Sequence, residues 1–229
     1  MINSKSVYAR RKYKKIDKVP FIVLIGTVSP TSLTNFLEEY FHTDHIQDEE
    51  VTRHCVLMQP YGPEKIPDLH LILNKSKYLI NLQYIEGSAL EPQDLERCLI
   101  EKADAVIILS DKFSYDADQQ DSHTILEAML IKKYLSKQKK KGGNNSTMVC
   151  MQLLRYQSIT HYELSNYEET KNDRIVCIES LKLSLLAKSC LCPGLVVLIT
   201  NLIKSSLDSN EIDMFLDEKK DDPNYQWLY

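Results

Sequence analysis

The sequence predicts an α/β fold, a Rossmann-like doubly wound parallel sheet followed by a helix-turn-helix pair. Two observations carry this prediction. Short runs of apolar and β-branched residues alternate with helical segments over most of the chain, and short connections join them, as in consecutive βαβ units. Two strongly apolar helical segments then follow one another beyond residue 174, separated at Pro193-Gly194.

The expected strands are continuous apolar runs, as strands covered on both faces require. They span residues 21–25, 53–58, 82–85, 105–109 and 147–153. The helices expected between and after them span 29–41, 67–77, 91–100, 122–134, 178–191 and 195–205, with a weak helix or edge element at 158–166. The pair Ser29-Pro30 supports one of these starts, because serine is a favoured N-cap and proline fits the first helical turn.

Composition divides the chain into four expected parts. Residues 1–20 form a basic linker and residues 21–173 the Rossmann-like core. Residues 174–206 form a helix-turn-helix element that we expect to mediate assembly, and residues 207–229 form an acidic tail, expected to be a truncated second subdomain. Within the core, residues 136–146 are a low-complexity insert rich in Lys, Gly and Asn, which indicates an exposed loop.

Charge is distributed unevenly along a chain whose formal net charge is −4. Residues 1–18 hold seven Lys or Arg residues against one Asp, so the remainder is strongly acidic. A basic segment of this kind can contact an anionic membrane surface, although a solvated linker is the commoner outcome. The acidic remainder argues against nucleic acid as a partner.

Several protein classes are disfavoured by what the sequence lacks. No apolar run approaches the ~18 to 20 residues of a membrane span, and the basic start has no apolar segment behind it, so neither a transmembrane segment nor a signal peptide is expected. The six cysteines are scattered without a Cys-x-x-Cys pair, which favours buried reduced thiols in the cytosol over disulfides or zinc.

Enzyme motifs are also missing. Residues 26–31, Gly-Thr-Val-Ser-Pro-Thr, keep only the first glycine of a dinucleotide fingerprint, so we expect no NAD. The histidines form no His-x-x-x-His pair, and no Gly-x-Ser-x-Gly elbow exists. The sequence therefore predicts a non-catalytic protein.

The most informative stretch follows the expected strand at 105–109. Its loop carries Asp116, Asp118 and Asp121, at the carboxyl edge of the sheet where such folds bind ligands. Closely spaced carboxylates suit a hard cation such as Ca²⁺. In the alternative interpretation, Asp121 caps a helix that begins near Ser122 and the other two are solvated turn residues. Spacing alone favours the cap.

A family resemblance changes that weighing. The chain from about Phe21 to Ile203 resembles the first RCK (regulator of K⁺ conductance) domain of the Slo family of calcium- or sodium-activated potassium channels, most specifically in the helix pair at 187–202. The matching blocks are Gly87-Ser-Ala-Leu-Glu-Pro-Gln-Asp-Leu-Glu-Arg97, Glu101-Lys-Ala-Asp-Ala-Val-Ile-Ile-Leu109, the Asp116–Asp121 loop, Ile131-Lys-Lys-Tyr134, Ile178-Glu-Ser-Leu-Lys-Leu183, Ala187-Lys-Ser-Cys-Leu191, Pro193-Gly-Leu195 and Thr200-Asn-Leu202.

This resemblance implies a cytosolic ligand-sensing domain in the gating ring of a BK-type, calcium-activated potassium channel. Such a domain is joined by a linker to the pore subunits of a homotetramer, contacts neighbouring RCK domains, lies on the cytoplasmic side of the membrane, and couples cation binding to pore opening and potassium transport. The positions that match the calcium-sensing aspartates are Asp116 and Asp121, with Asp118 between them. Sodium-gated relatives also carry acids here, so Ca²⁺, Na⁺ and no ion all stay open.

Two rival functions remain on sequence grounds. One is a free-standing RCK-like regulator that acts on a channel in trans, and the other is a degenerate nucleotide-binding oxidoreductase-like domain. A nucleotide bound to the purified protein would favour the latter.

Overall fold

A parallel six-stranded sheet, with the strand order β3-β2-β1-β4-β5-β6, forms the centre of the computed structural model. The structure describes residues 6–26, 29–42, 53–66, 68–75, 78–140, 147–165 and 173–204. The strands are β1 (Phe21–Gly26), β2 (His54–Gln59), β3 (Leu82–Glu86), β4 (Ala105–Leu109), β5 (Met148–Leu153) and β6 (Asp173–Cys177). The predicted doubly wound α/β fold is confirmed.

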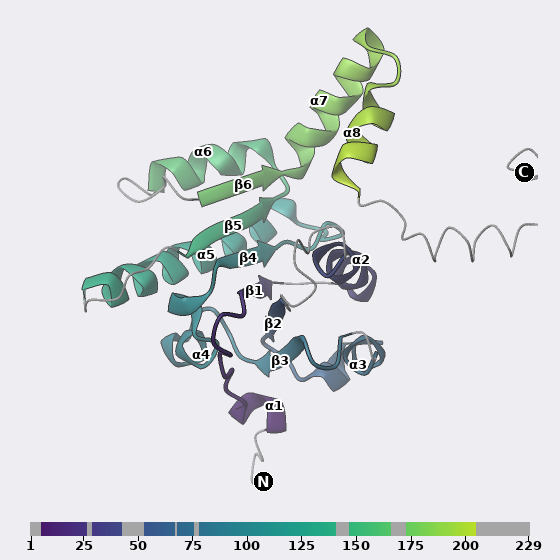
Figure 1. The fold of residues 1–229 in the computed structure, drawn as a ribbon. Coiled ribbons are helices and arrows are strands. Elements are labelled where there is room, and N and C mark those ends of the chain that lie inside the picture. The colour runs from purple at the N-terminus through teal and green to yellow at the C-terminus, as the bar shows by residue number, and fades with distance from the viewer. Residues whose placement is uncertain are drawn as a thin grey trace, which may run out of the picture.

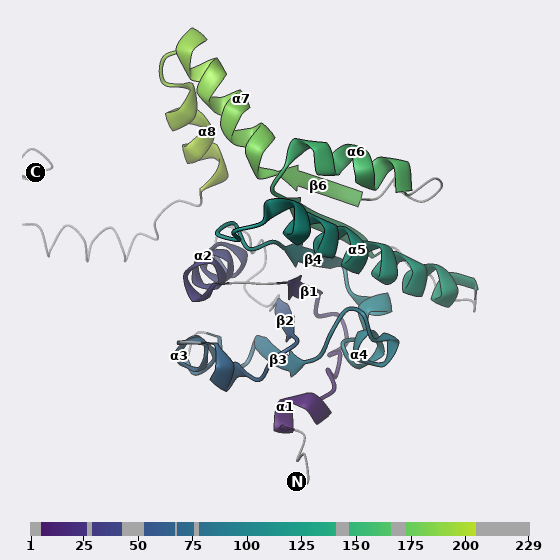
Figure 2. The ribbon, with the colours of Figure 1, turned by 180° about the vertical axis from the view of Figure 1, so that it is seen from behind.

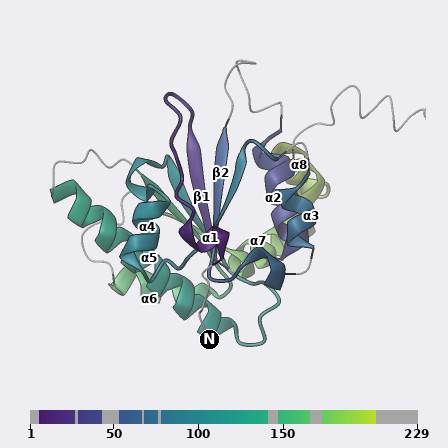
Figure 3. The ribbon, with the colours of Figure 1, turned by 90° about the horizontal axis from the view of Figure 1, so that it is seen from below.

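Helices cover both faces of the sheet (Figure 1). They are α1 (Val7–Arg10), α2 (Pro30–Tyr40), α3 (Leu69–Leu73), α4 (Pro92–Arg97), α5 (Ala117–Lys140), α6 (Tyr156–Ser165), α7 (Ile178–Leu191) and α8 (Leu195–Ile203), with 3₁₀ turns at Pro63–Lys65 and Ile100–Lys102. Figure 3 shows α2 and α3 on one side of the sheet and α4 and α5 on the other.

The central strand β1 supplies both halves of the core. Phe21, Val23 and Ile25 pack into the cluster beneath α4, α5 and α6, whereas Ile22 and Leu24 pack into the cluster beneath α2 and α3. This alternation follows from the two-residue period of a strand, and it explains why the whole run is apolar.

Gly26 ends β1 where the strand order reverses, between β1 and β4. Its φ is +98°, and a Cβ at this position would lie 2.1 Å from the carbonyl oxygen of Leu109. Only glycine satisfies both constraints, so this turn can bring the ends of β1 and β4 together.

The helix pair α7–α8 projects from the rest of the molecule, as Figures 1 and 2 show from opposite sides. Helix α7 follows β6 without an intervening loop, and neither α7 nor α8 has a buried residue. Many of the side chains that they expose are large and apolar: Leu181, Leu183, Leu186, Leu191, Val196, Val197, Leu198, Leu202 and Ile203. An apolar surface of this size on one projecting element indicates an interaction face.

Several expected bounds differ from the structure. The helices expected at 67–77 and 91–100 are shorter, at Leu69–Leu73 and Pro92–Arg97, and two further differences are larger. Strand β6 was not foreseen, because it lies at the sheet edge, alternates between covered and exposed positions, and begins with the charged pair Asp173 and Arg174. Helix α5 spans Ala117–Lys140 instead of 122–134. Its first turn is polar and solvated, and the lysine-rich stretch that was expected to be loop continues the helix as far as Lys140.

Residues 1–20 were expected to be a basic linker, and the part that the structure describes, from Ser6, packs on the core. Tyr13 is 3% exposed, its ring centroid lies 4.6 Å from that of Phe21, and its hydroxyl lies 3.0 Å from His54 Nδ1. Arg97 donates to the carbonyl oxygens of Tyr8 and Arg11 at 3.1 Å each. The aromatic residues of this basic segment therefore anchor it while its cationic side chains stay exposed.

Among the residues that the structure describes, no helix combines the length and apolar character needed to cross a membrane. The acidic tail at 207–229 lies outside the described residues, as do residues 141–146 of the insert.

Candidate functional site

The loop between β4 and α5 is held by hydrogen bonds at both ends. At its start, the Ser110 hydroxyl lies 2.8 Å from Thr124 Oγ1 and donates to the carbonyl oxygen of Gln152 at 2.7 Å. Further along, Asp111 Oδ1 accepts from the backbone N–H of Phe113 at 3.0 Å. These contacts tie the loop to α5 and β5, at the carboxyl edge of the sheet.

Asp116 is the N-cap of α5. Its Oδ1 atom accepts from the backbone N–H groups of Asp118, at 3.1 Å, and Gln119, at 3.0 Å. A carboxylate here satisfies helix N–H groups that have no partner within the helix, and it interacts favourably with the helix dipole. The alternative interpretation was right about the role but wrong about the residue, since it assigned the cap to Asp121.

Asp121 instead lies one turn inside α5 and is 1% exposed. Its Oδ1 accepts from the N–H of Leu154 at 2.8 Å, and its Oδ2 accepts from the N–H of Arg155 at 2.9 Å. Both carboxylate oxygens therefore hold the turn that leaves β5. A buried carboxylate needs such partners, because an unpaired one would be very costly.

Asp118 points to solvent, with a side chain that is 76% exposed. Its Oδ1 lies 3.8 Å from Arg155 Nε, an exposed ion pair of small energetic value. The three aspartates thus have three different partners and do not converge. No group of three His, Cys, Asp or Glu side chains in the described part of the chain could hold a metal ion.

These residues alone do not fit a calcium ion. Calcium takes six to eight oxygen ligands, whereas Asp121 already accepts two N–H groups and Asp116 uses one oxygen as a cap. The metal assignment to Asp116, Asp118 and Asp121 stays a prediction that rests on the family resemblance.

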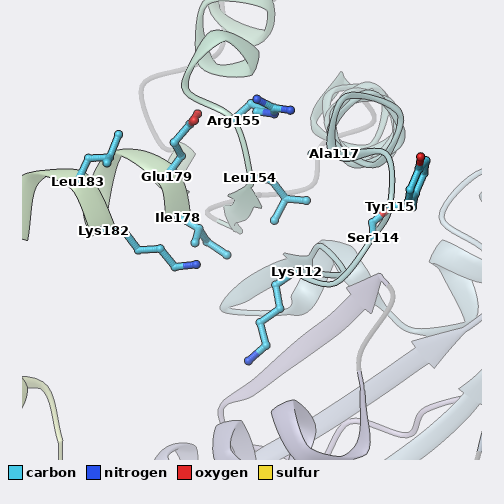
Figure 4. A pocket seen from close by; sticks show the side chains of 10 residues that line it. All are labelled: Lys112, Ser114, Tyr115, Ala117, Leu154, Arg155, Ile178, Glu179, Lys182 and Leu183. Atoms are coloured by element: carbon cyan, nitrogen blue, oxygen red, sulfur yellow. The ribbon is translucent and has the colours of Figure 1, made fainter. Parts of the chain in front are cut away.

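A cleft of about 450 Å³ opens between this loop and the base of α7 (Figure 4). Leu154 and Ile178 contribute its apolar surface, and its charged residues are Lys112, Arg155 and Lys182 against the single carboxylate of Glu179. Figure 4 shows Lys112 and Lys182 extending toward the same open region, while Glu179 points away from it. The cationic residues disfavour a bare cation in the cleft itself.

Sequence reasoning missed this cleft because its residues come from three separated segments. Glu179, in the first turn of α7, accepts from the N–H of Tyr156 at 3.0 Å through Oε2, and its own N–H donates to the Leu154 carbonyl oxygen at 3.2 Å. The sequence around Glu179 does not indicate that its side chain binds the β5–α6 turn.

At the place where Rossmann folds bind dinucleotides, the described pocket is small. The described residues leave a pocket of about 40 Å³ at the ends of β1, β4 and β5, lined by residues that include Ser29, Ser110 and Gln152. Nearby, Gln59 Nε2 donates to the Gly26 carbonyl oxygen at 2.5 Å. Ligand pockets are commonly about 300 to 1,000 Å³, larger than this one.

The cysteines differ in their exposure to solvent. Cys55, Cys98 and Cys177 are buried, whereas Cys190 and Cys192 at the end of α7 are exposed, and all are free thiols. Burial raises the pKa of both Cys55 and Cys98 to about 12. Their thiols therefore stay protonated and unreactive at neutral pH.

Comparison with known proteins assigns most of the chain. The family model described as the calcium-activated potassium channel slowpoke-like RCK domain matches residues 17–160. A second model, described as the calcium-activated BK potassium channel alpha subunit, matches residues 173–229. The first family is a channel regulatory domain and not an enzyme family.

One curated relative agrees with the family models, and one solved structure shares the fold. The chain is 28% identical over 182 residues to the calcium-activated potassium channel slowpoke of Drosophila melanogaster, an alignment that covers 79% of this chain and 14% of the relative. The human SLO3 gating ring superposes with a TM-score of 0.60 at 24% identity, covering 83% of this chain and 30% of that one. The GsuK RCK domain gives a TM-score of 0.43 at 11% identity, covering 72% and 28%. The chain thus spans only a small part of the length of these relatives.

Proposed function

This chain belongs to the slowpoke-like RCK domain family of calcium-activated potassium channels, and we propose that it is a cytosolic ligand-sensing domain of a channel gating ring. In this role it couples cation binding to pore opening, and so to potassium transport, on the cytoplasmic side of a membrane. The family match over residues 17–160 is the observation that carries the proposal.

The exposed helix pair supports the assembly that a gating ring needs. Neither α7 nor α8 buries a residue in the chain alone, although α7 is rich in leucine and α8 in leucine, valine and isoleucine. Packing on a neighbouring RCK domain would cover this surface, and an obligate interface of that kind buries roughly 2,000 Å² or more. The partners are then other RCK domains and the pore subunits of a homotetramer.

Calcium is the cation that the family description favours. The described residues at Asp116, Asp118 and Asp121 supply too few unengaged oxygens to complete its coordination, so further ligands have to come from elsewhere. The proposal keeps these three aspartates as candidates and derives no gating step through the ion.

A chimeric channel tests the proposal. Residues 17–229, which cover both family matches, would replace the matching segment of the Drosophila slowpoke channel, and currents would be recorded from inside-out patches. We expect potassium currents whose open probability rises with calcium on the cytoplasmic face. A chimera that also carries Gly26→Val is the control without current, because a side chain there collides with Leu109. The proposal would be overturned by chimeras that assemble at the cell surface but whose open probability does not change with calcium.

A further inference from the structure

The turn between β5 and α6 has three consecutive backbone N–H groups, and carboxylates from two different helices accept all three. Leu154 and Arg155 donate to Asp121 on α5, at 2.8 and 2.9 Å. Tyr156 donates to Oε2 of Glu179 on α7, at 3.0 Å. The backbone N–H of Glu179 also binds this turn, because it donates to the Leu154 carbonyl oxygen at 3.2 Å.

From this arrangement we infer that Glu179 is a positioning residue, which fixes the direction of α7 by binding it to the same turn that Asp121 holds. The inference deepens the proposed function and rests on it for the role of α7 in assembly. The inference means that Asp121 and the base of α7 are physically connected. A movement of the Asp121 carboxylate would move the backbone of residues 154–156, and that backbone holds Glu179.

The attachment of α7 makes this connection decisive. Only the first turn, at Ile178, Glu179 and Ser180, is half-buried, and the residues beyond it are almost all exposed. In the part of the chain that the structure describes, no residue of α7 is buried, so the contacts at its base are the ones that set its direction. Glu179 is the residue of that base with hydrogen bonds from both its side chain and its backbone to the β5–α6 turn.

The position of the contact at two helix ends strengthens it. Tyr156 is the first residue of α6, so its N–H group has no partner within that helix. The Glu179 carboxylate satisfies this group and lies at the amino-terminal ends of both α6 and α7. Negative charge at these ends is stabilised by two helix dipoles, which makes the contact stronger than one between neutral groups.

A spin-label distance measurement on the full chain tests the inference. One label is placed on Cys190, at the exposed far end of α7, and the other on Lys133→Cys, on the exposed side of α5. Cys192→Ser and Cys150→Ser remove the other exposed and half-buried thiols, so that labelling is specific. Labelled protein is diluted into unlabelled protein, so that only distances within a chain are read. We expect a single narrow distance peak for this background.

Two substitutions remove the same hydrogen bond from opposite sides. Glu179→Ala removes the acceptor, and Tyr156→Pro removes the donor at the first position of a helix, where proline is tolerated. Both should lose the narrow peak, whereas Glu179→Gln, which keeps an acceptor oxygen, should retain it. The matched control is Glu163→Ala, an exposed glutamate on α6.

The outcomes separate the inference from the proposed function. If folded Glu179→Ala and Tyr156→Pro proteins give the same narrow peak as the background, Glu179 is merely a helix cap and the inference fails. The distance is measured on the purified chain, so it tests the inference even if the slowpoke chimera carries no calcium-dependent current. In a working chimera, Glu179→Ala should shift the calcium dependence of opening, while Glu163→Ala should not.

Discussion

Lys132 on α5 and Asp173 at the start of β6 form a buried ion pair, with 2.6 Å between Nζ and Oδ2. Their side chains are 8% and 5% exposed, and the Tyr162 hydroxyl on α6 donates to the same carboxylate oxygen at 2.7 Å. Three elements thus meet at the first residue of the edge strand that leads into α7.

Breaking this pair should destabilise the chain strongly. Asp173→Ala leaves the Lys132 ammonium buried without its carboxylate, so we expect the free energy of unfolding in urea to fall by about 3 to 5 kcal/mol. Lys133→Ala, one residue along α5 but exposed, is the control and should change it little. An Asp173→Ala protein as stable as wild type would show that the pair contributes nothing.

The stability of the chain should depend on pH through Glu127. Burial raises the pKa of this carboxyl from 4.5 to about 7, and the side chain is 8% exposed. Between these pH values the native state binds more protons than the unfolded state. The stabilisation is therefore complete below the unfolded pKa and is lost as pH rises through the native one.

Comparison with Glu127→Gln isolates this contribution, because glutamine does not titrate. Wild type should lose stability relative to Glu127→Gln between about pH 5 and pH 8, by about 1.4 kcal/mol for each unit of pKa shift. The exposed substitution Glu163→Gln should leave the pH profile of wild type unchanged. Parallel curves for wild type and Glu127→Gln would contradict the prediction.

The apolar helix pair should drive self-association. Leu186 and Leu198 are 66% and 57% exposed, one on each helix, so Leu186→Asp with Leu198→Asp should abolish association without loss of fold. Sedimentation at micromolar concentration and binding of a dye for exposed apolar surface provide the measurements. Leu164→Asp, at an exposed leucine on α6, is the matched control. A wild-type protein that sediments only as a monomer and binds no dye would count against the interface.

The basic segment should bind anionic vesicles through its exposed cations. Replacing Arg10, Lys12 and Lys14 by Ala should weaken binding by about 1 kcal/mol for each residue at moderate salt, because each contributes through the surface potential of the membrane. Vesicle co-sedimentation over a salt series measures the effect.

An equal loss of charge elsewhere gives the control for that measurement. Lys137, Lys139 and Lys140 lie at the carboxyl end of α5, and their replacement by Ala should leave vesicle binding unchanged. Binding to neutral vesicles as strong as to anionic ones would rule out the electrostatic mechanism.

Calcium binding by the chain should be weak, with a Kd on the order of 10⁻⁵ to 10⁻³ M, because the described carboxylates do not complete a site. Calorimetry of wild type against Asp116→Asn with Asp121→Asn measures it. Asparagine keeps the one oxygen that accepts at position 116 and one of the two that accept at position 121. Asp111→Asn, in the same loop, is the control. Identical isotherms for wild type and the double variant would leave only the structural roles of these aspartates.

Much of the sheet could be predicted from the sequence, because strands covered on both faces must be apolar throughout. The run at 105–109 coincides with β4, and the run at 21–25 differs from β1 only by Gly26. Strand β6 was not predicted, because an edge strand has one solvated side and therefore no continuous apolar run. Its first residue, Asp173, is charged, and its covered side chain is paired with Lys132. The start of α5 escaped because its first turn is polar and is capped by Asp116.

The site was less predictable than the sheet. The sequence indicated that Asp121 is special, but its donors are the backbone N–H groups of Leu154 and Arg155, which belong to another strand connection. Backbone donors leave no signature in side-chain spacing. Glu179 escaped for the same reason, since its partner is the backbone of Tyr156.

The direct passage from β6 into α7 has a mechanical consequence. With 14 residues and a rise of about 1.5 Å per residue, α7 is a rigid arm about 21 Å long, hinged at its first turn. A tilt of about 10° at the hinge would carry the far end through about 4 Å, given that length. A small displacement at the base of α7 would thereby become a larger one where α7 turns into α8.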